Sequence, residues 1–244
     1  MTYLQPQFIL FEIVIVYLSA VIQSSLGLGF AMLSSAVLPL FLPMVESTVL
    51  ISIAVTVLGF YLTWKVRGYI NYKVAFPAVI GLLIGKALGI VMLMHIHNDV
   101  LKRVLGFVLL SFAVFFMVGK ELRIRPTVWK GLFLGVLAGI LGGLYNLSGP
   151  FLVIYFLSTC PDKYEYSASM NFSFAPASLL GTVMHYFYGN ITQPILYLSI
   201  FNVAAVVAGI LTGLSIFKHM DRKWMEKCLY ILMAVMGIFL IVNG

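Results

Sequence analysis

The sequence predicts an all-α polytopic membrane protein built from two inverted-topology repeats. Hydrophobic residues make up 62% of its 244 residues, charged residues make up only 9%, and the mean hydropathy is +1.07. A chain of this composition cannot cover a single core with a wettable surface. Its apolar residues form continuous blocks, whereas a membrane β-barrel shows alternating residues. In addition, the two halves of the chain can be aligned with each other. These three observations predict a bundle of membrane helices.

Ten apolar blocks are expected to form helices, five in each half of the chain. A hydrocarbon core about 30 Å thick needs about 20 residues per helix, and most blocks approach or reach that length. The blocks of the first half are 8–26, 28–43, 47–66, 74–95 and 100–119, and those of the second half are 129–145, 147–160, 166–187, 192–216 and 223–243. The second block of each half is short and follows a break that contains glycine.

The alignment of the halves predicts an internal duplication. LSAVIQSSLGLGF (18–30) lies over LAGILGGLYNLSG (137–149) without a gap. In the fourth blocks, three small residues at every fourth position fall on three others at a constant offset of 124: Gly81, Gly85 and Gly89 on Ala205, Gly209 and Gly213. Such a stripe lets two membrane helices approach closely, so each fourth block is expected to pack tightly against a neighbour. We predict repeats at 1–119 and 131–244, joined by a basic cytoplasmic linker at 120–130.

The cations predict the topology. They cluster in loops at 65–73, 120–130 and 218–227, which the positive-inside rule assigns to the cytoplasm. The loop at 187–193 is equivalent to 65–73 but carries no charge, so the two copies are expected to be inverted, with both termini outside the cell membrane. The first two blocks of each half then form a hairpin that starts and ends on one side. We expect the two uncharged tips to approach each other inside the protein; ten complete crossings are the alternative.

These features resemble a known family. A glycine-containing break followed by a short apolar block occurs twice, with small-residue stripes and a basic central loop. Over nearly its whole length the chain resembles the sulfite exporter TauE/SafE family of membrane permeases. The resemblance implies transport of sulfite, organosulfonates and related small anions. The chain departs from the glycine-rich tips of the family at Phe30, Asn146 and Ser148, so we expect its substrate preference to differ at the second tip.

The hairpin tips are the predicted binding site. Breaking a helix in lipid exposes N–H and C=O groups at a cost of several kcal/mol each unless protein, water or a ligand satisfies them. Free N–H groups at a helix start bind anions, and a proline suits the first turn of a helix. The substrate-binding residues expected at the tips are Ser24, Ser25, Gly27 and Gly29 in the first copy and Tyr145, Asn146, Ser148, Gly149 and Pro150 in the second. The alternative is that the tips are kinks filled by small residues.

Four further polar residues within the blocks are candidates. Ser52, Asn171 and Ser173 lie in the two third blocks, where they either line the site or bond to their own helices and neighbours. Lys86 lies near the middle of its block, where a lysine costs about 2.5–3.5 kcal/mol on insertion scales. It either faces an aqueous pathway and attracts an anion, which we favour, or pairs with a buried acid such as Glu12. His185 is interpreted as an interfacial residue.

These features favour a secondary transporter. No nucleophile, acid–base pair, metal cluster or ATP-binding loop stands at a useful spacing, so we expect no enzyme activity, metal or cofactor. The net charge of +7 lies in short loops and indicates topology, so no nucleic acid is expected. The hypothesis is alternating access for small sulfur anions such as sulfite, thiosulfate or sulfoacetate. The expected partners are this anion, the lipid bilayer and, as a coupling ion, a proton or sodium. The alternatives are an ion-coupled carrier of a carboxylate or amino-acid metabolite, and a membrane scaffold or sulfur-enzyme subunit.

Overall fold

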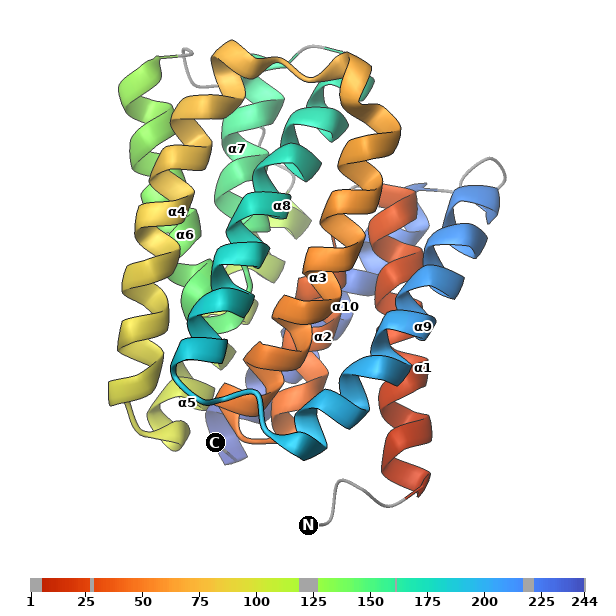
Figure 1. The fold of residues 1–244 in the computed structure, drawn as a ribbon. Coiled ribbons are helices and arrows are strands. Elements are labelled where there is room, and N and C mark those ends of the chain that lie inside the picture. Colours follow the sequence, from red (N-terminus) through yellow and green to blue (C-terminus); the bar gives the residue numbers. More distant parts are fainter. Residues whose placement is uncertain (1–5, 27–28, 119–126, 161, 217–221, 244) are drawn as a thin grey trace.

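The fold is a bundle of helices, shown by a computed structural model that describes residues 6–26, 29–118, 127–160, 162–216 and 222–243 (Figure 1). Within these ranges the chain forms ten α-helices and no strand. The α-helices are α1 (Pro6–Leu26), α2 (Phe30–Val37), α3 (Met44–Val66), α4 (Tyr72–His95), α5 (Asn98–Val118), α6 (Val128–Tyr145), α7 (Gly149–Thr159), α8 (Lys163–Phe187), α9 (Gln193–Ile216) and α10 (Arg222–Asn243). Two short 3-10 helices, η2 (Leu38–Leu40) and η3 (Arg67–Tyr69), follow α2 and α3.

The helices confirm the predicted all-α polytopic fold class, because each of the ten apolar blocks forms one α-helix. The main difference lies in the second block, where α2 ends at Val37 instead of near residue 43. Pro39 lacks the N–H that would continue the helix, and Pro43 precedes the first residue of α3. Six of the described helices are long and apolar enough to cross a membrane, namely α1, α3 (with η3), α4, α5, α6 and α9. The two helices that follow the breaks, α2 and α7, are shorter.

The glycine stripes bring two pairs of helices into close contact, as predicted. A Cβ atom on Gly85 of α4 would lie 2.1 Å from the carbonyl oxygen of Val136 on α6. On the other side of the molecule, a Cβ on Gly209 of α9 would lie 2.6 Å from the carbonyl oxygen of Tyr17 on α1. Real Cβ atoms essentially never approach this closely, so only glycine permits these backbone contacts.

The same contacts join equivalent positions of the two proposed repeats, 1–119 and 131–244, whose duplication stays a prediction. Gly85 and Gly209 are equivalent in the alignment of the halves, and so are Val136 and Tyr17. One turn further along, Gly89 packs on Ile140 and Gly213 packs on Val21, which are again equivalent pairs. The fourth helix of each half therefore packs on the first helix of the other half. Residues 119–126, which include most of the proposed linker, lie outside the described residues.

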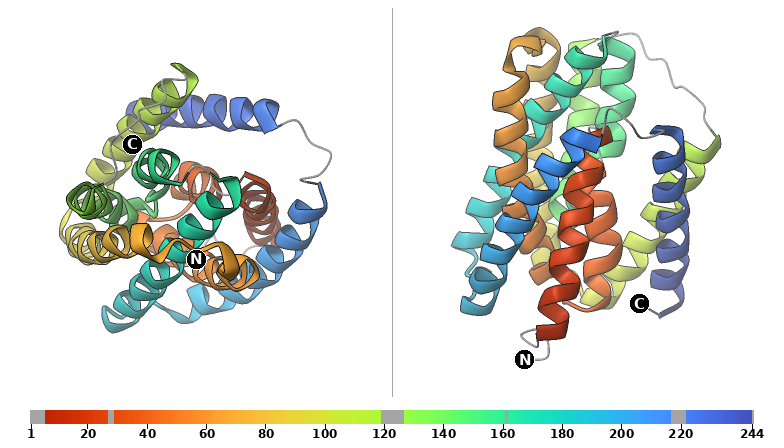
Figure 2. Two further views of the ribbon diagram at one scale, coloured as in Figure 1. Left: turned by 90° about the horizontal axis from the view of Figure 1, so that it is seen from above. Right: turned by 90° about the vertical axis from the view of Figure 1, so that its right-hand side faces the viewer.

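Two broken hairpins enter the bundle from opposite ends. In Figure 1 the hairpin of α1 and α2 opens toward the lower end, and that of α6 and α7 opens toward the upper end. Helices α3 and α8 pack against each other in the middle, while α5 and α10 form a separate pair on one side (Figure 2). Helix α1 begins and α10 ends at the lower end, whereas α4, α6 and α8 begin at the upper end (Figure 1). That the upper end faces the cytoplasm stays a prediction.

Candidate functional site

The second hairpin tip is shaped by Asn146. This residue has φ 59°, in the left-handed region, and it ends α6, where its backbone N–H donates to the carbonyl oxygen of Gly142 at 3.1 Å. Asparagine enters this region at a lower cost than most residues, which explains why it can stand where the first tip has a glycine. Helix α7 then begins at Gly149, with Pro150 in its first turn as expected.

The Asn146 side chain ties this tip to two other helices. Its Oδ1 accepts hydrogen bonds from Nζ of Lys86 on α4 at 2.8 Å and from Oγ of Ser52 on α3 at 3.0 Å. Its Nδ2 donates to the backbone carbonyl oxygen of Thr48 on α3 at 2.9 Å. Both polar atoms of the Asn146 side chain therefore have partners inside the protein, and three of the predicted site residues (Ser52, Lys86 and Asn146) meet at one point.

Lys86 is buried without a carboxylate partner. It is 3% exposed, and within the described residues no acidic oxygen lies within 4 Å of its ammonium group. The alternative pairing with Glu12 is not seen, because Glu12 accepts a hydrogen bond from Asn202 instead. Helix α8 passes close to the lysine: a Cβ on Gly181 would lie 2.6 Å from its Cε and 3.2 Å from its Nζ. A glycine at position 181 makes room for the lysine side chain.

The position of His185 corrects the interpretation made from the sequence, which placed it at the membrane interface. It is 0% exposed rather than interfacial, and it lies one helical turn beyond Gly181 on the same face of α8. Its Nδ1 lies 3.1 Å from Nδ2 of Asn190, and its Nε2 has no hydrogen-bond partner among the described residues. The spacing of four between Gly181 and His185 was the available signal. It was missed because nothing in the sequence indicates which face of α8 meets Lys86.

The first tip is capped by a side chain that was not among the predicted site residues. The backbone N–H of Phe30, the first residue of α2, donates to Oε1 of Gln23 at 3.1 Å. Gly29 precedes it with φ 127°, a conformation that favours glycine. Gln23 therefore occupies one of the N–H groups that were expected to bind an anion. Gly27 lies outside the described residues.

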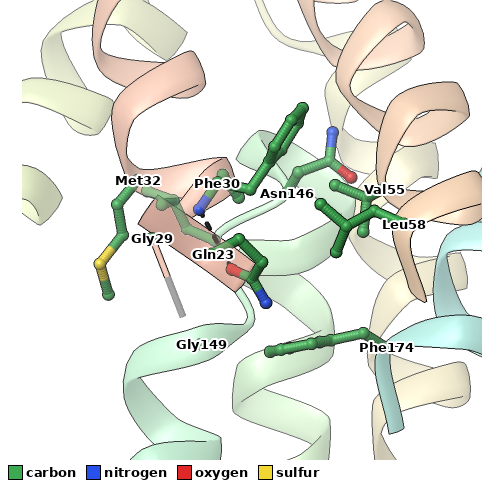
Figure 3. A pocket seen from close by; sticks show the side chains of 11 residues that line it. Gln23, Gly29, Phe30, Met32, Val55, Leu58, Asn146, Gly149 and Phe174 are labelled. Atoms are coloured by element: carbon green, nitrogen blue, oxygen red, sulfur yellow. Dashed lines mark hydrogen bonds between the residues drawn. The ribbon is translucent and has the colours of Figure 1, made fainter. Parts of the chain in front are cut away.

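A small cavity separates the two tips (Figure 3). Its volume is about 30 Å³, and its lining comes from both hairpins and from α3 and α8: Gln23, Gly29, Phe30, Ala31, Met32, Val55, Leu58, Asn146, Leu147, Gly149 and Phe174. The predicted approach of the tips inside the protein is confirmed by this shared lining. A cavity of this size has room for about one or two water molecules.

Three of the predicted site residues form hydrogen bonds away from the cluster of Lys86, Ser52 and Asn146. Three hydroxyl groups donate to backbone carbonyl oxygens: Ser24 to Ala20 at 2.5 Å, Ser173 to Ser169 at 2.8 Å and Ser25 to Gly213 at 3.1 Å. The Ser24 bond lies within α1 and the Ser173 bond lies within α8, whereas the Ser25 bond joins α1 to α9.

Three further predicted residues are buried near or beyond the tip. Asn171 donates to the carbonyl oxygen of Ser167 at 2.8 Å, and it lies ten residues, or about 15 Å, along α8 from Gly181. The Tyr145 hydroxyl is buried and has no partner among the described residues. Ser148 packs on Gly142: a Cβ added to Gly142 would lie 2.0 Å from the Oγ of Ser148. Asn171 therefore does not join Lys86, whereas Ser148 lies beside the second tip.

The fold and this site define a class of protein: a helical, multi-pass membrane protein with two interrupted helices that meet inside the bundle. In the described part of the chain, no group of three or more histidine, cysteine or acidic residues is placed to hold a metal ion. A family model described as "Sulfite exporter TauE/SafE" matches residues 13–240. The chain belongs to this family of membrane transporters. Comparison with curated proteins and with solved structures finds no match.

Proposed function

We propose that the protein carries small sulfur-containing anions, such as sulfite, thiosulfate, sulfoacetate or other organosulfonates, across the cell membrane by alternating access. Membership of a transporter family supports this class of function, and the family description names sulfite. The observation that carries the proposal is Lys86, a buried lysine whose Nζ donates to Asn146 at the tip of a broken helix.

Lys86 favours an anion for electrostatic reasons. A buried charge loses several kcal/mol of hydration, and an opposite charge close by offsets this loss. In the described part of the protein, its hydrogen-bond partner is the neutral amide of Asn146. An ammonium group has three donors, so an anion beside Asn146 can bond to Lys86 and supply the opposite charge.

Asn146 links anion binding to movement of the tip. Its Oδ1 uses one donor from Lys86 and the donor of Ser52, and an anion at this point competes for both. Losing these bonds removes the side-chain links from Asn146 to Lys86 of α4 and Ser52 of α3, and leaves the bond from its Nδ2 to Thr48 as the remaining side-chain link of the tip to α3. The cavity of about 30 Å³ is too small for a tetrahedral or pyramidal oxyanion, so the tips have to separate to admit one. Binding and opening are thereby coupled, as alternating access requires.

The test is uptake of labelled sulfite and thiosulfate by the purified protein in liposomes, with carboxylates and amino acids as competitors. We expect saturable uptake of a sulfur anion that Lys86→Met lowers about 10- to 150-fold in kcat/KM. This range corresponds to loss of one charged hydrogen bond worth about 1.5–3 kcal/mol. Lys65→Met is the matched control, because Lys65 is exposed at the end of α3. This variant should transport the anion at the wild-type rate.

Two results would contradict the proposal. One is the absence of uptake for every sulfur anion by folded protein, together with uptake of a carboxylate or an amino acid. The other is equal uptake by Lys86→Met and Lys65→Met, which would separate the lysine from the site. Thermal shift provides a check without flux, since a ligand at 100 times its Kd stabilises the folded state by about 2.7 kcal/mol.

A further inference from the structure

A second buried ionisable group lies away from the Lys86 site, between α1 and α9. These helices run side by side in both Figure 1 and Figure 2. Glu12 of α1 and Asn202 of α9 are each 1% exposed, and Nδ2 of Asn202 donates to Oε1 of Glu12 at 2.9 Å. At the equivalent positions of the other half stand Gly131 and Ala78, so this polar pair belongs to one copy alone.

The oxygen of the Asn202 amide indicates which form of Glu12 fits. Oδ1 of Asn202 is buried and has no hydrogen-bond partner among the described residues. An ionised carboxylate has only acceptors and cannot serve this oxygen, whereas a protonated carboxyl group has an O–H donor. A carboxylic acid and a primary amide can form two reciprocal hydrogen bonds. One of the two is already present, and a proton on Oε2 supplies the donor for the other.

Among the described residues, no cation interacts with Glu12. Helix α1 packs against α9, α2 and α10. The described titratable side chains on these four helices, apart from Glu12, are Tyr17, Tyr197, Lys227 and Tyr230, and no charge interaction with Glu12 is found for any of them. Burying an ionised carboxylate without such a partner is unfavourable by several kcal/mol. The packed interface of α1 and α9 therefore favours the neutral acid.

We propose that Glu12 and Asn202 form a proton-binding site, in which Glu12 takes a proton from water onto Oε2 and donates it to Oδ1 of Asn202. The coupling of this site to transport rests on the proposed function. Return of the proton to water leaves a carboxylate that needs hydration, which favours separation of α1 from α9. In the structure these helices touch through Gly209 and Gly213, so ionisation of Glu12 is expected to loosen this contact.

Infrared spectroscopy of the purified protein tests the site without any transport. We expect the carbonyl-stretch band of a protonated carboxylic acid at neutral pH, and we expect Glu12→Gln to remove it. Glu46→Gln is the matched control, because Oε2 of Glu46 is also buried without a partner among the described residues. This variant should keep the Glu12 band. A band that Glu12→Gln leaves unchanged, or that is absent from the wild type, overturns the proposal.

Thermal unfolding in detergent provides a second readout. Glutamine offers the same donor and acceptor pattern as a protonated glutamate, so Glu12→Gln should unfold at a Tm that stays constant as the pH rises. The wild-type Tm should fall over the same range because the proton is withdrawn. Equal pH dependence in both proteins contradicts the proposal. A rise in Tm on adding sodium chloride instead of potassium chloride, lost in Glu12→Gln, also overturns it, in favour of a sodium site.

Coupling is measured in liposomes that contain a pH-sensitive dye, with thiosulfate as the anion because it carries no proton of its own near neutral pH. Wild-type protein should move protons with thiosulfate, and Glu12→Gln should exchange thiosulfate without proton movement. Thiosulfate uptake with no proton movement in the wild type overturns coupling. If no anion is carried but the infrared band depends on Glu12, the proton site stands and the proposed function fails.

Discussion

Replacing Gly85 with alanine should push α4 away from α6. The new Cβ would lie 2.1 Å from the carbonyl oxygen of Val136, about 1.3 Å short of an ordinary contact at 3.4 Å. The backbone cannot yield locally, because α6 also packs closely on α4 at Gly139 and Gly143, where an added Cβ would lie 2.4 and 2.5 Å from carbonyl oxygens of α4. Overpacking of this kind costs about 1–3 kcal/mol.

For a chain of this size the expected loss is about 2–12 °C in Tm, at about 2–4 °C per kcal/mol. The assay is thermal unfolding of the purified protein in detergent, followed by tryptophan fluorescence. In Gly209→Ala the added Cβ would lie 2.6 Å from its nearest atoms, so the loss of stability should be smaller than in Gly85→Ala. Gly68→Ala should change stability by less than about 0.5 kcal/mol, since nothing lies within 4 Å of its Cβ position. The reasoning is refuted if Gly85→Ala and Gly68→Ala unfold at the same temperature.

Three other variants test local features of the fold by the same unfolding assay. Asn146→Ala should unfold at a lower temperature than Asn146→Gly. Both variants lose the same side-chain bonds, but the left-handed conformation at this position costs alanine about a further 1–2 kcal/mol. A higher unfolding temperature for Asn146→Ala than for Asn146→Gly would contradict this. Asp162→Ala should lose about 0.5–2 kcal/mol, because Asp162 caps α8 by accepting from Tyr164 and Glu165 N–H groups, and Asp162→Asn should retain most of that stability. Ser25→Ala should lose about 0.5–1.5 kcal/mol through the missing bond to Gly213, and an unchanged Tm would show that this link between α1 and α9 is dispensable.

Local patterns were sufficient to place the helices and the closest helix contacts. A membrane helix is a long apolar block, and its ends follow from proline, glycine and charge over a few residues, so the ten blocks matched ten helices. The error in the second block came from a local signal that was present but not used, the proline at position 39. The glycine stripes also predicted tight packing, because a spacing of four puts small residues on one face wherever the helix lies.

The candidate site was predictable only in part, because its residues come from distant parts of the chain. Lys86 and Asn146 were each expected to matter, yet they lie 60 positions apart and nothing in the sequence indicates that Nζ of one bonds Oδ1 of the other. Which face of a helix meets which neighbour depends on the rotation and crossing of whole helices. For the same reason Asn171 was expected near the site and lies about 15 Å along α8 from Gly181, while Gly181 itself went unnoticed.

By itself, then, the sequence determined that this chain lies in a membrane, where most of its helices begin and end, and which of them carry small-residue faces, since all of these depend on residues close together along the chain. Only the tertiary structure decided that Lys86 pairs with the amide of Asn146, that Glu12 pairs with Asn202, and that Gln23 caps α2. A buried polar side chain bonds to whatever group the packing of the helices brings within reach. That choice is made in space between helices, and no pattern within one helix records it.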